Sequence, residues 1–166
     1  MSSNVFAQYN NVVPLVQPID LGTTDTATPY VQLKGCHRLA FLVQFGVTTQ
    51  NATTDIIDVR VECASLETVA ETAVTFNYRL SSAVTANTWG AVTAATATGA
   101  ELNYNHEGMS LWIEPDMSAL WAADYKFVRL AVALNAFTVC LVSAVAIVDS
   151  RFGMTTMTTS TACASS

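Results

Sequence analysis

Charged residues are scarce in this 166-residue chain: they make up 12% of the sequence, whereas hydrophobic residues make up 51%. Soluble globular domains carry about 25% charged residues, so most of the polar surface must come from Thr, Ser, Asn and Gln. A monomer with so few charges has little with which to keep its surface hydrated. The composition therefore favours a chain that is partly covered by copies of itself or by a larger assembly. A Thr-rich β domain that is soluble alone is the alternative.

Basic runs are also lacking, since five Arg and two Lys are spread singly along a chain of net charge −6. Direct nucleic-acid binding is not expected, because no basic cluster interleaved with aromatic residues is there to neutralise phosphates. Residues 1–15 contain no positive stretch followed by an apolar core, which predicts no signal peptide. The four cysteines form no CxxC or other close pair. We expect free thiols in a reducing compartment, with Cys63 and Cys140 as core residues.

Motifs that carry catalytic chemistry are absent: no GxGxxG, GxxxxGK[ST], GxSxG or HExxH pattern occurs. Of the two histidines, His106 falls in an expected loop and His37 follows Cys36. Neighbouring strand residues point to opposite faces, so Cys36 and His37 make a poor nucleophile–base pair. We expect no enzyme. Paired carboxylates that hydrolyse glycosides meet only in the fold, so the sequence leaves that alternative open.

Two acidic groups are candidates for the oxygen ligands of a metal ion: Asp55, Asp58 and Glu62, and Glu101 with Glu107. The first group falls on the polar face of an expected strand and is better explained as solvated surface. No calcium-loop pattern occurs. We therefore expect no metal and no cofactor, with structural calcium in a loop as the alternative.

Helix signals are nearly absent, and the prolines within the first thirty residues exclude a long helix there. Asp116 is placed to cap one short helix that carries Met117, Leu120 and Trp121. Residues 66–72 are a weaker helix candidate. Neither segment is long enough to build a helical domain.

Strand patterns are abundant. Residues 56–64 place apolar Ile57, Val59, Val61 and Cys63 at every second position, with charged residues between them. This period of two is typical of a half-buried strand. Further strands are predicted at residues 12–16, 37–47, 73–79, 110–114 and 125–134.

Residues 130–148 contain no charge over nineteen positions, which is long enough for a membrane helix. Asn135 near the middle is a good turn residue, the residues before it alternate, and those after it are rich in Val as in a strand buried on both faces. No basic cluster marks a cytoplasmic side. We expect a β-hairpin that turns near Asn135 and Ala136, and no membrane span.

These strands predict an all-β fold, an antiparallel β-sandwich of jelly-roll or Greek-key type. We expect residues 1–29 to form an extended N-terminal arm with an edge strand. We expect residues 30–153 to form the sandwich domain and residues 154–166 to form a polar C-terminal tail.

Aromatic residues support a second functional hypothesis, a carbohydrate-binding β-sandwich for host recognition. The sugar-stacking platform would consist of Trp89, Trp112, Trp121, Tyr78 and Tyr104. Trp112 alternates with Leu111 and Ile113, so we expect it to face outward, as aromatic residues often do at binding or subunit surfaces.

The order of residues 73–95, 98–134 and 146–153 matches a known pattern. It consists of a Y-R-x-S segment leading to W-G, then a K-Y/F-V-R-L strand, then an Arg–aromatic pair after the last strand. The matching residues are Tyr78, Arg79, Trp89, Gly90, Lys126, Phe127, Val128, Arg129, Arg151 and Phe152, with Ser150 where Pro is often found. In this order the chain resembles small capsid-associated proteins of tailed bacteriophages over most of residues 12–153.

The resemblance implies a capsid decoration, or cement, protein: a virion structural subunit bound to the outside of an icosahedral phage head, where it stabilises contacts between major capsid subunits. Another head or tail structural protein is the alternative. The expected partners are the major capsid protein and copies of itself, as a dimer or trimer, after assembly in the host bacterial cytoplasm. The expected interface residues are Val5, Phe6, Tyr9, Val12, Val13, Leu15, Val16, Trp112, Phe152, Met154 and Met157.

Overall fold

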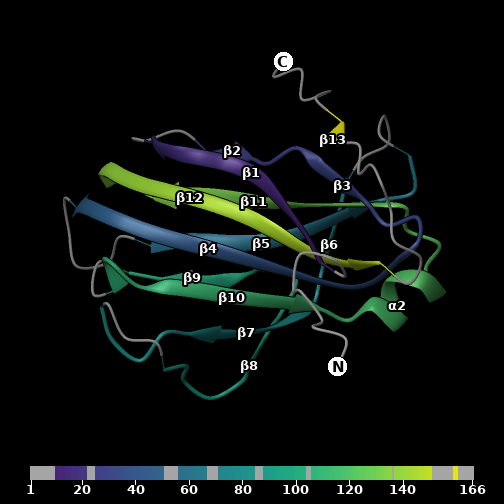
Figure 1. The fold of residues 1–166 in the computed structure, drawn as a ribbon. Coiled ribbons are helices and arrows are strands. Elements are labelled where there is room, and N and C mark those ends of the chain that lie inside the picture. Colours follow the sequence, from purple (N-terminus) through teal and green to yellow (C-terminus); the bar gives the residue numbers. More distant parts are fainter. Residues whose placement is uncertain are drawn as a thin grey trace, which may run out of the picture.

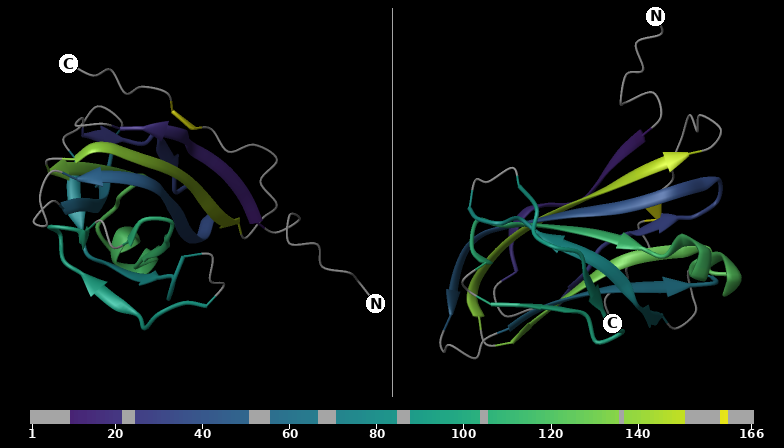
Figure 2. Two further views of the ribbon diagram at one scale, coloured as in Figure 1. Left: turned by 90° about the vertical axis from the view of Figure 1, so that its left-hand side faces the viewer. Right: turned by 90° about the horizontal axis from the view of Figure 1, so that it is seen from below.

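The computed structural model describes residues 10–21, 25–50, 56–66, 71–84, 88–103, 106–135, 137–150 and 159–160. They form two antiparallel sheets, one in front of the other in Figure 1 and one above the other in the right-hand view of Figure 2, so the all-β sandwich is confirmed. The front sheet has the strand order β1 (Asn10–Asp20), β12 (Phe137–Ser150), β4 (Cys36–Gln50), β10 (Ser110–Pro115), β7 (Phe76–Leu80) and β8 (Thr93–Ala95). The second sheet has the order β13 (Thr159–Ser160), β3 (Tyr30–Gln32), β11 (Phe127–Asn135), β5 (Ile56–Ala64) and β6 (Thr72–Val74). In this sheet β2 (Thr26–Ala27) also pairs with β11, and β9 (Ala100–Leu102) pairs with β5.

The core lies between the two sheets and is built from the alternate residues that the sequence pattern predicted. On β5, Ile57, Val59 and Val61 are at most 1% exposed. On β4, Phe41 and Val43 face them from the front sheet and are fully buried. Because β-branched and aromatic side chains fill this layer, the hydrophobic burial that stabilises the sandwich comes from residues far apart in the chain.

The uncharged segment around Asn135 consists of two strands, but they do not form the predicted hairpin. β11 pairs with β5 over its whole length in the second sheet, whereas β12 lies between β1 and β4 in the front sheet. β11 and β12 therefore lie in different sheets, and the chain passes from one sheet to the other between them instead of folding back on itself. Alternation fixes which face of each strand is inward, but it does not choose the neighbouring strand.

The predicted strand at residues 73–79 is divided. β6 pairs with β5 in the second sheet, and β7 pairs with β10 and β8 in the front sheet, so the chain changes sheets at Thr75. Phe76 and Tyr78 nevertheless point toward the core, as the alternation predicted. The period-two pattern continues through Thr75, so the sequence gives no sign that the chain changes sheets there.

One short helix, α2 (Met117–Ala122), closes one end of the sandwich, on the right in Figure 1. Asp116 caps it as predicted, because its carboxylate accepts hydrogen bonds from the amides of Ser118 and Ala119. Leu120 is buried, which anchors the helix on the core. The weaker helix candidate at residues 66–72 falls largely on residues 67–70, outside the described residues.

Within the described residues, no helix has the length and apolar character to span a membrane. At the N-terminal end, β1 is an edge strand of the front sheet, next to β12. At the C-terminal end, Thr159 and Ser160 pair with Val31 and Tyr30 of β3 at the edge of the second sheet.

Candidate functional site

The outer side of the front sheet is apolar at its centre. Val145 of β12 lies beside Pro14 on one side and Leu42 on the other, and Leu42 lies beside Trp112 of β10. In the next row, Ile147 lies between Val12 and Ala40. We call this surface the apolar face. It consists of Val12, Pro14, Leu42, Trp112, Val145 and Ile147. These residues lie on the outer side of the front sheet, and this side of the sheet is turned toward the viewer in Figure 1.

The apolar face corrects the expectation that β12 is buried on both sides. Its even-numbered residues from Cys140 to Val148 are buried, but Val145 and Ile147 are only half-buried and Leu141 is exposed. Val12 on the neighbouring strand is 54% exposed. The second face of β12 therefore has the composition of a core strand without any covering layer among the described residues.

Charged residues lie at the margins of the apolar face. At one end, Arg38 approaches Glu114 at 3.7 Å and His37 approaches Asp149 at 3.8 Å, and all four side chains are substantially exposed. Between this end and the apolar rows is a hollow of about 320 Å³, in which the small Ala40 lies near Trp112 and Ile147. An uncharged centre with a polar rim is the usual anatomy of a protein–protein interface.

The outer side of the second sheet has the opposite character. Arg129 forms ion pairs with Glu62 at 2.9 Å and Glu71 at 3.0 Å, and its guanidinium lies 5.0 Å from the centre of the Tyr30 ring. The Tyr30 hydroxyl donates a hydrogen bond of 2.7 Å to the Glu71 carboxylate. Arg129 and Glu62 are only 15% and 18% exposed. Because these charges are paired within the sheet, this side is suited to remain in water.

We expect Tyr30→Phe to reduce the pH dependence of stability. The hydrogen bond from Tyr30, followed by that from the Glu71 backbone, lowers the pKa of Glu71 below its usual 4.5. A lowered carboxyl pKa gives stability that is present above the usual pKa and is lost as pH falls through the folded-state pKa. Urea denaturation from pH 7 to pH 3 should show a steeper acid loss for the natural protein than for Tyr30→Phe. Parallel curves would contradict this assignment.

The predicted sugar platform is not assembled. Trp89 and Trp112 contact each other edge to face, with ring centres 6.0 Å apart. Tyr78 points toward the core on β7, and Trp121 lies on α2. Tyr104 lies outside the described residues. Trp112 does face outward, as its alternation with buried Leu111 and Ile113 predicted.

Cys36 and His37 do not form a catalytic pair. The Cys36 thiol is buried and donates a hydrogen bond to the backbone carbonyl of Arg38, whereas His37 is exposed. Burial, and then the charge of Asp149, raise the pKa of Cys36 to about 12, so the nucleophilic thiolate is suppressed. His106 accepts a hydrogen bond through Nδ1 from the Asn103 amide within its own loop.

Three thiols should be protected from alkylation in the folded protein. Burial, with Glu62 as the second cause, raises the pKa of Cys63 to about 12, and burial, with Asp20 as the second cause, raises that of Cys140 to about 11. Iodoacetamide at pH 8 should leave Cys36, Cys63 and Cys140 unmodified, with all four cysteines reacting once urea unfolds the chain. Peptide mass spectrometry reads each site separately. Rapid native labelling of any of the three would contradict their burial.

Two of the acidic candidates for a metal ion, Asp58 and Glu62, are paired with arginines. The Asp58 carboxylate accepts a hydrogen bond of 2.7 Å from Arg60, and Glu62 pairs with Arg129. No group of three or more metal-ligating side chains forms among the described residues. Asp55 lies outside them.

The expected interface residues fall into three groups. Val12 is exposed and Trp112 is half-buried on the apolar face. Leu15 is buried in the core of the protein itself, and Val13 and Val16 pack against that core. Val5, Phe6, Tyr9, Phe152, Met154 and Met157 lie outside the described residues. The role of all of these residues at an interface stays a prediction. Leu42, Val145 and Ile147 were not among them, although their alternation with core residues was a signal that could have identified them.

The chain thus has one apolar outer face and one ion-paired outer face, and Trp121 lies on α2 outside both sheets. No family model, no curated protein and no solved structure matches it. Its function is therefore inferred from these surfaces and from the order of its strands.

Proposed function

We propose that this protein is a virion structural subunit of the capsid decoration type, which binds the outer surface of an icosahedral phage head through the apolar face. The observation that carries this proposal is the contrast between the two outer sides. Val145, Leu42 and Trp112 leave an apolar surface open, whereas Arg129, Glu62 and their partners keep the other side polar. An adhesive subunit has this asymmetry, with one side on the shell and one in solvent.

The strand order supports a jelly-roll topology, which we propose as the type of the sandwich. The chain alternates between the sheets along β1, β3, β4, β5 and again along β10, β11, β12. As a result β1, β12, β4 and β10 are neighbours in one sheet, and β3, β11, β5 and β6 are neighbours in the other. Eight strands in two sheets with this interleaving are common in viral capsid and lectin domains.

The size of the apolar face favours repeated contacts over one tight pair. The apolar face covers four strands, β1, β12, β4 and β10. Four strands roughly 4.8 Å apart, with about six residues of roughly 3.3 Å rise, span about 400 Å². A stable one-to-one interface buries about 800 Å² on each partner. One such contact is therefore modest, and firm binding needs several contacts made together, as in an oligomer on a symmetric shell.

Sedimentation velocity tests the proposal. The purified chain is run alone and mixed with heads of tailed phages that have been emptied of DNA and stripped of their own decoration proteins. We expect co-sedimentation that saturates at a copy number set by icosahedral symmetry. A protein that sediments as a free species and binds none of the shells would overturn the proposal.

A further inference from the structure

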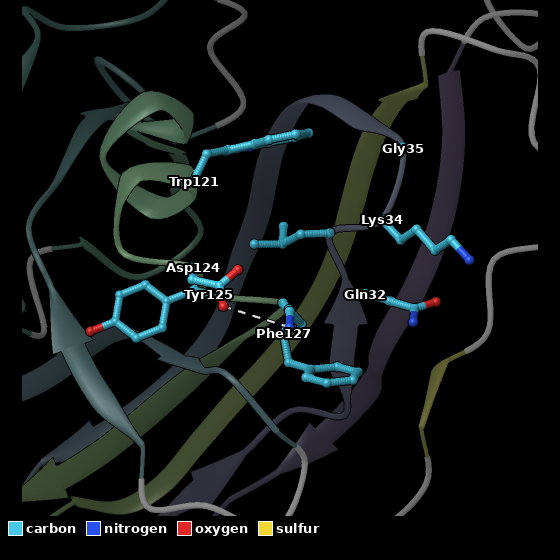
Figure 3. Close-up of a pocket in the computed structure, with 9 residues that line it drawn as sticks. Gln32, Lys34, Gly35, Trp121, Asp124, Tyr125 and Phe127 are labelled. Carbon is cyan, nitrogen blue, oxygen red and sulfur yellow. Dashed lines mark ion pairs between the residues drawn. The ribbon is translucent and has the colours of Figure 1, made fainter.

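A second surface feature lies at the end of the sandwich, between α2 and the turn that joins β3 to β4. It is a hollow of about 390 Å³, within the range of roughly 300–1,000 Å³ typical of small-molecule sites. Figure 3 shows Trp121 on one side of this hollow and Phe127 on the other, with Lys34 on the rim and its side chain extended away from Trp121. Leu33 also lines it. None of the residues of the apolar face lines this hollow.

The hollow gathers positive charge in an acidic protein. Lys34 and Lys126 both line it, and they are the only two lysines in a chain of net charge −6. Lys126 lies 3.6 Å from Asp124, whereas Lys34 forms no ion pair with any residue that the structure describes. With two lysines and one carboxylate on its lining, the hollow has a surplus positive charge that favours an anionic ligand.

Trp121 supplies a stacking surface. Its side chain is 53% exposed, and Figure 3 shows the indole extending over the hollow toward Gly35. A large aromatic side chain left in water at the wall of a cavity has one ring face free for a ligand. Leu33 and Phe127 add apolar surface to the lining, which an inorganic anion would leave without a contact.

The rim also holds a backbone outlier. Asp124 follows the C-cap of α2 with a φ of 57°, in the left-handed region where Gly is the usual residue. The amide of Asp124 donates to Trp121 and the amide of Tyr125 donates to Leu120, which closes the helix end. Asp adopts this region more readily than most residues with a Cβ, so the turn at the helix end accounts for its backbone. The Asp124 side chain is 84% exposed, which leaves its carboxylate accessible at the rim of the hollow.

We propose that this hollow binds an acidic saccharide, a pyranose ring that carries a carboxylate. The apolar C–H face of the ring stacks on Trp121, the flexible side chain of Lys34 reaches the carboxylate, and Asp124 and Lys126 bind the hydroxyls. Neutral sugars fit the same stacking surface but lack the partner for Lys34. The site is separate from the apolar face, and its test uses no capsid, so either proposal can fail without the other.

Nuclear magnetic resonance titration of the full chain tests this site with three probes: methyl glucuronide, methyl glucoside and sodium acetate. Each is added to about 20 mM, which nearly saturates a site of millimolar affinity. We expect the glucuronide to shift the Trp121 indole N–H signal and to bind roughly fivefold more tightly than the glucoside, with no shift from acetate. Trp121→Ala assigns the signal, and isothermal calorimetry then gives the affinity of each variant.

Trp121→Ala should weaken glucuronide binding at least about tenfold, because the stacking surface is lost. Lys34→Gln should bring the affinity for the glucuronide down to that for the glucoside. Val92→Ala, which truncates another side chain that is 53% exposed, is the control and should bind like the natural protein. No Trp121 shift with the glucuronide, an equal response to acetate, or equal affinities for glucuronide and glucoside in the natural protein would each overturn the proposal.

Discussion

Val145→Glu should abolish binding to phage heads while leaving the protein folded. Val145 lies at the centre of the apolar face, between Pro14 and Leu42, and is half-buried on the outer side of β12. A carboxylate there would be desolvated without a partner when the face meets a shell, which costs several kcal/mol. Because each 1.4 kcal/mol is a factor of ten, affinity should fall at least about a hundredfold. Co-sedimentation with the stripped heads measures this loss.

Ala131→Glu is the matched control, since it introduces the same charge at a half-buried outward position of β11, next to Arg60 on the ion-paired side. It should bind heads as the natural chain does. Circular dichroism should show that both variants fold, because a strand substitution outside the core changes stability by about 1 kcal/mol. Hydrophobic-interaction chromatography gives a readout without capsids, in which Val145→Glu should elute first. A folded Val145→Glu protein that still saturates the heads would show that another surface makes the contact.

The inward face of each strand could be predicted from the sequence, because burial acts on every second residue. Ile57, Val59 and Val61 are inward for this reason. The pairing of strands could not be predicted in this way. β11 and β12 are adjacent in sequence but lie in different sheets, because β11 pairs with β5 and β12 pairs with β4, both of which are far away in the chain. That choice depends on the packing of the whole core.

The candidate sites were less accessible to sequence reasoning. The apolar face could not be predicted, because apolar residues occupy both sides of β12. The same pattern occurs in a strand that is covered on both sides, so the sequence does not show that the odd-numbered residues lack a covering layer. The hollow beside Trp121 brings Lys34 near Lys126, residues from two distant strand ends. Only α2 was predictable in detail, because Asp116 caps it through local hydrogen bonds.

Arg129→Met should lower the free energy of unfolding by about 2–3 kcal/mol, between the values for exposed and fully buried ion pairs. The substitution leaves the carboxylates of Glu62 and Glu71 without their cation at positions that are 18% and 34% exposed. It also removes the charge over the Tyr30 ring. Met keeps the length of the side chain, so the loss measures charge and hydrogen bonding more than packing. Urea denaturation at pH 7 gives the difference.

Arg38→Met is the control for this loss, because Arg38 is 72% exposed and 3.7 Å from Glu114, and such a pair contributes less than about 1 kcal/mol. The cost of Arg129→Met should also shrink in acid. The hydrogen bond from Tyr30 is the main cause that lowers the pKa of Glu71 below its usual 4.5, and once this carboxyl is protonated it no longer needs a cation. Glu62→Gln combined with Glu71→Gln should restore part of the stability of Arg129→Met at pH 7 for the same reason. An Arg129→Met protein that loses no more than Arg38→Met, at any pH, would show that the network is not a source of stability. The charges of the ion-paired side would then serve only to keep that side hydrated. This role is still expected if the apolar face lies on the shell and the ion-paired side faces solvent.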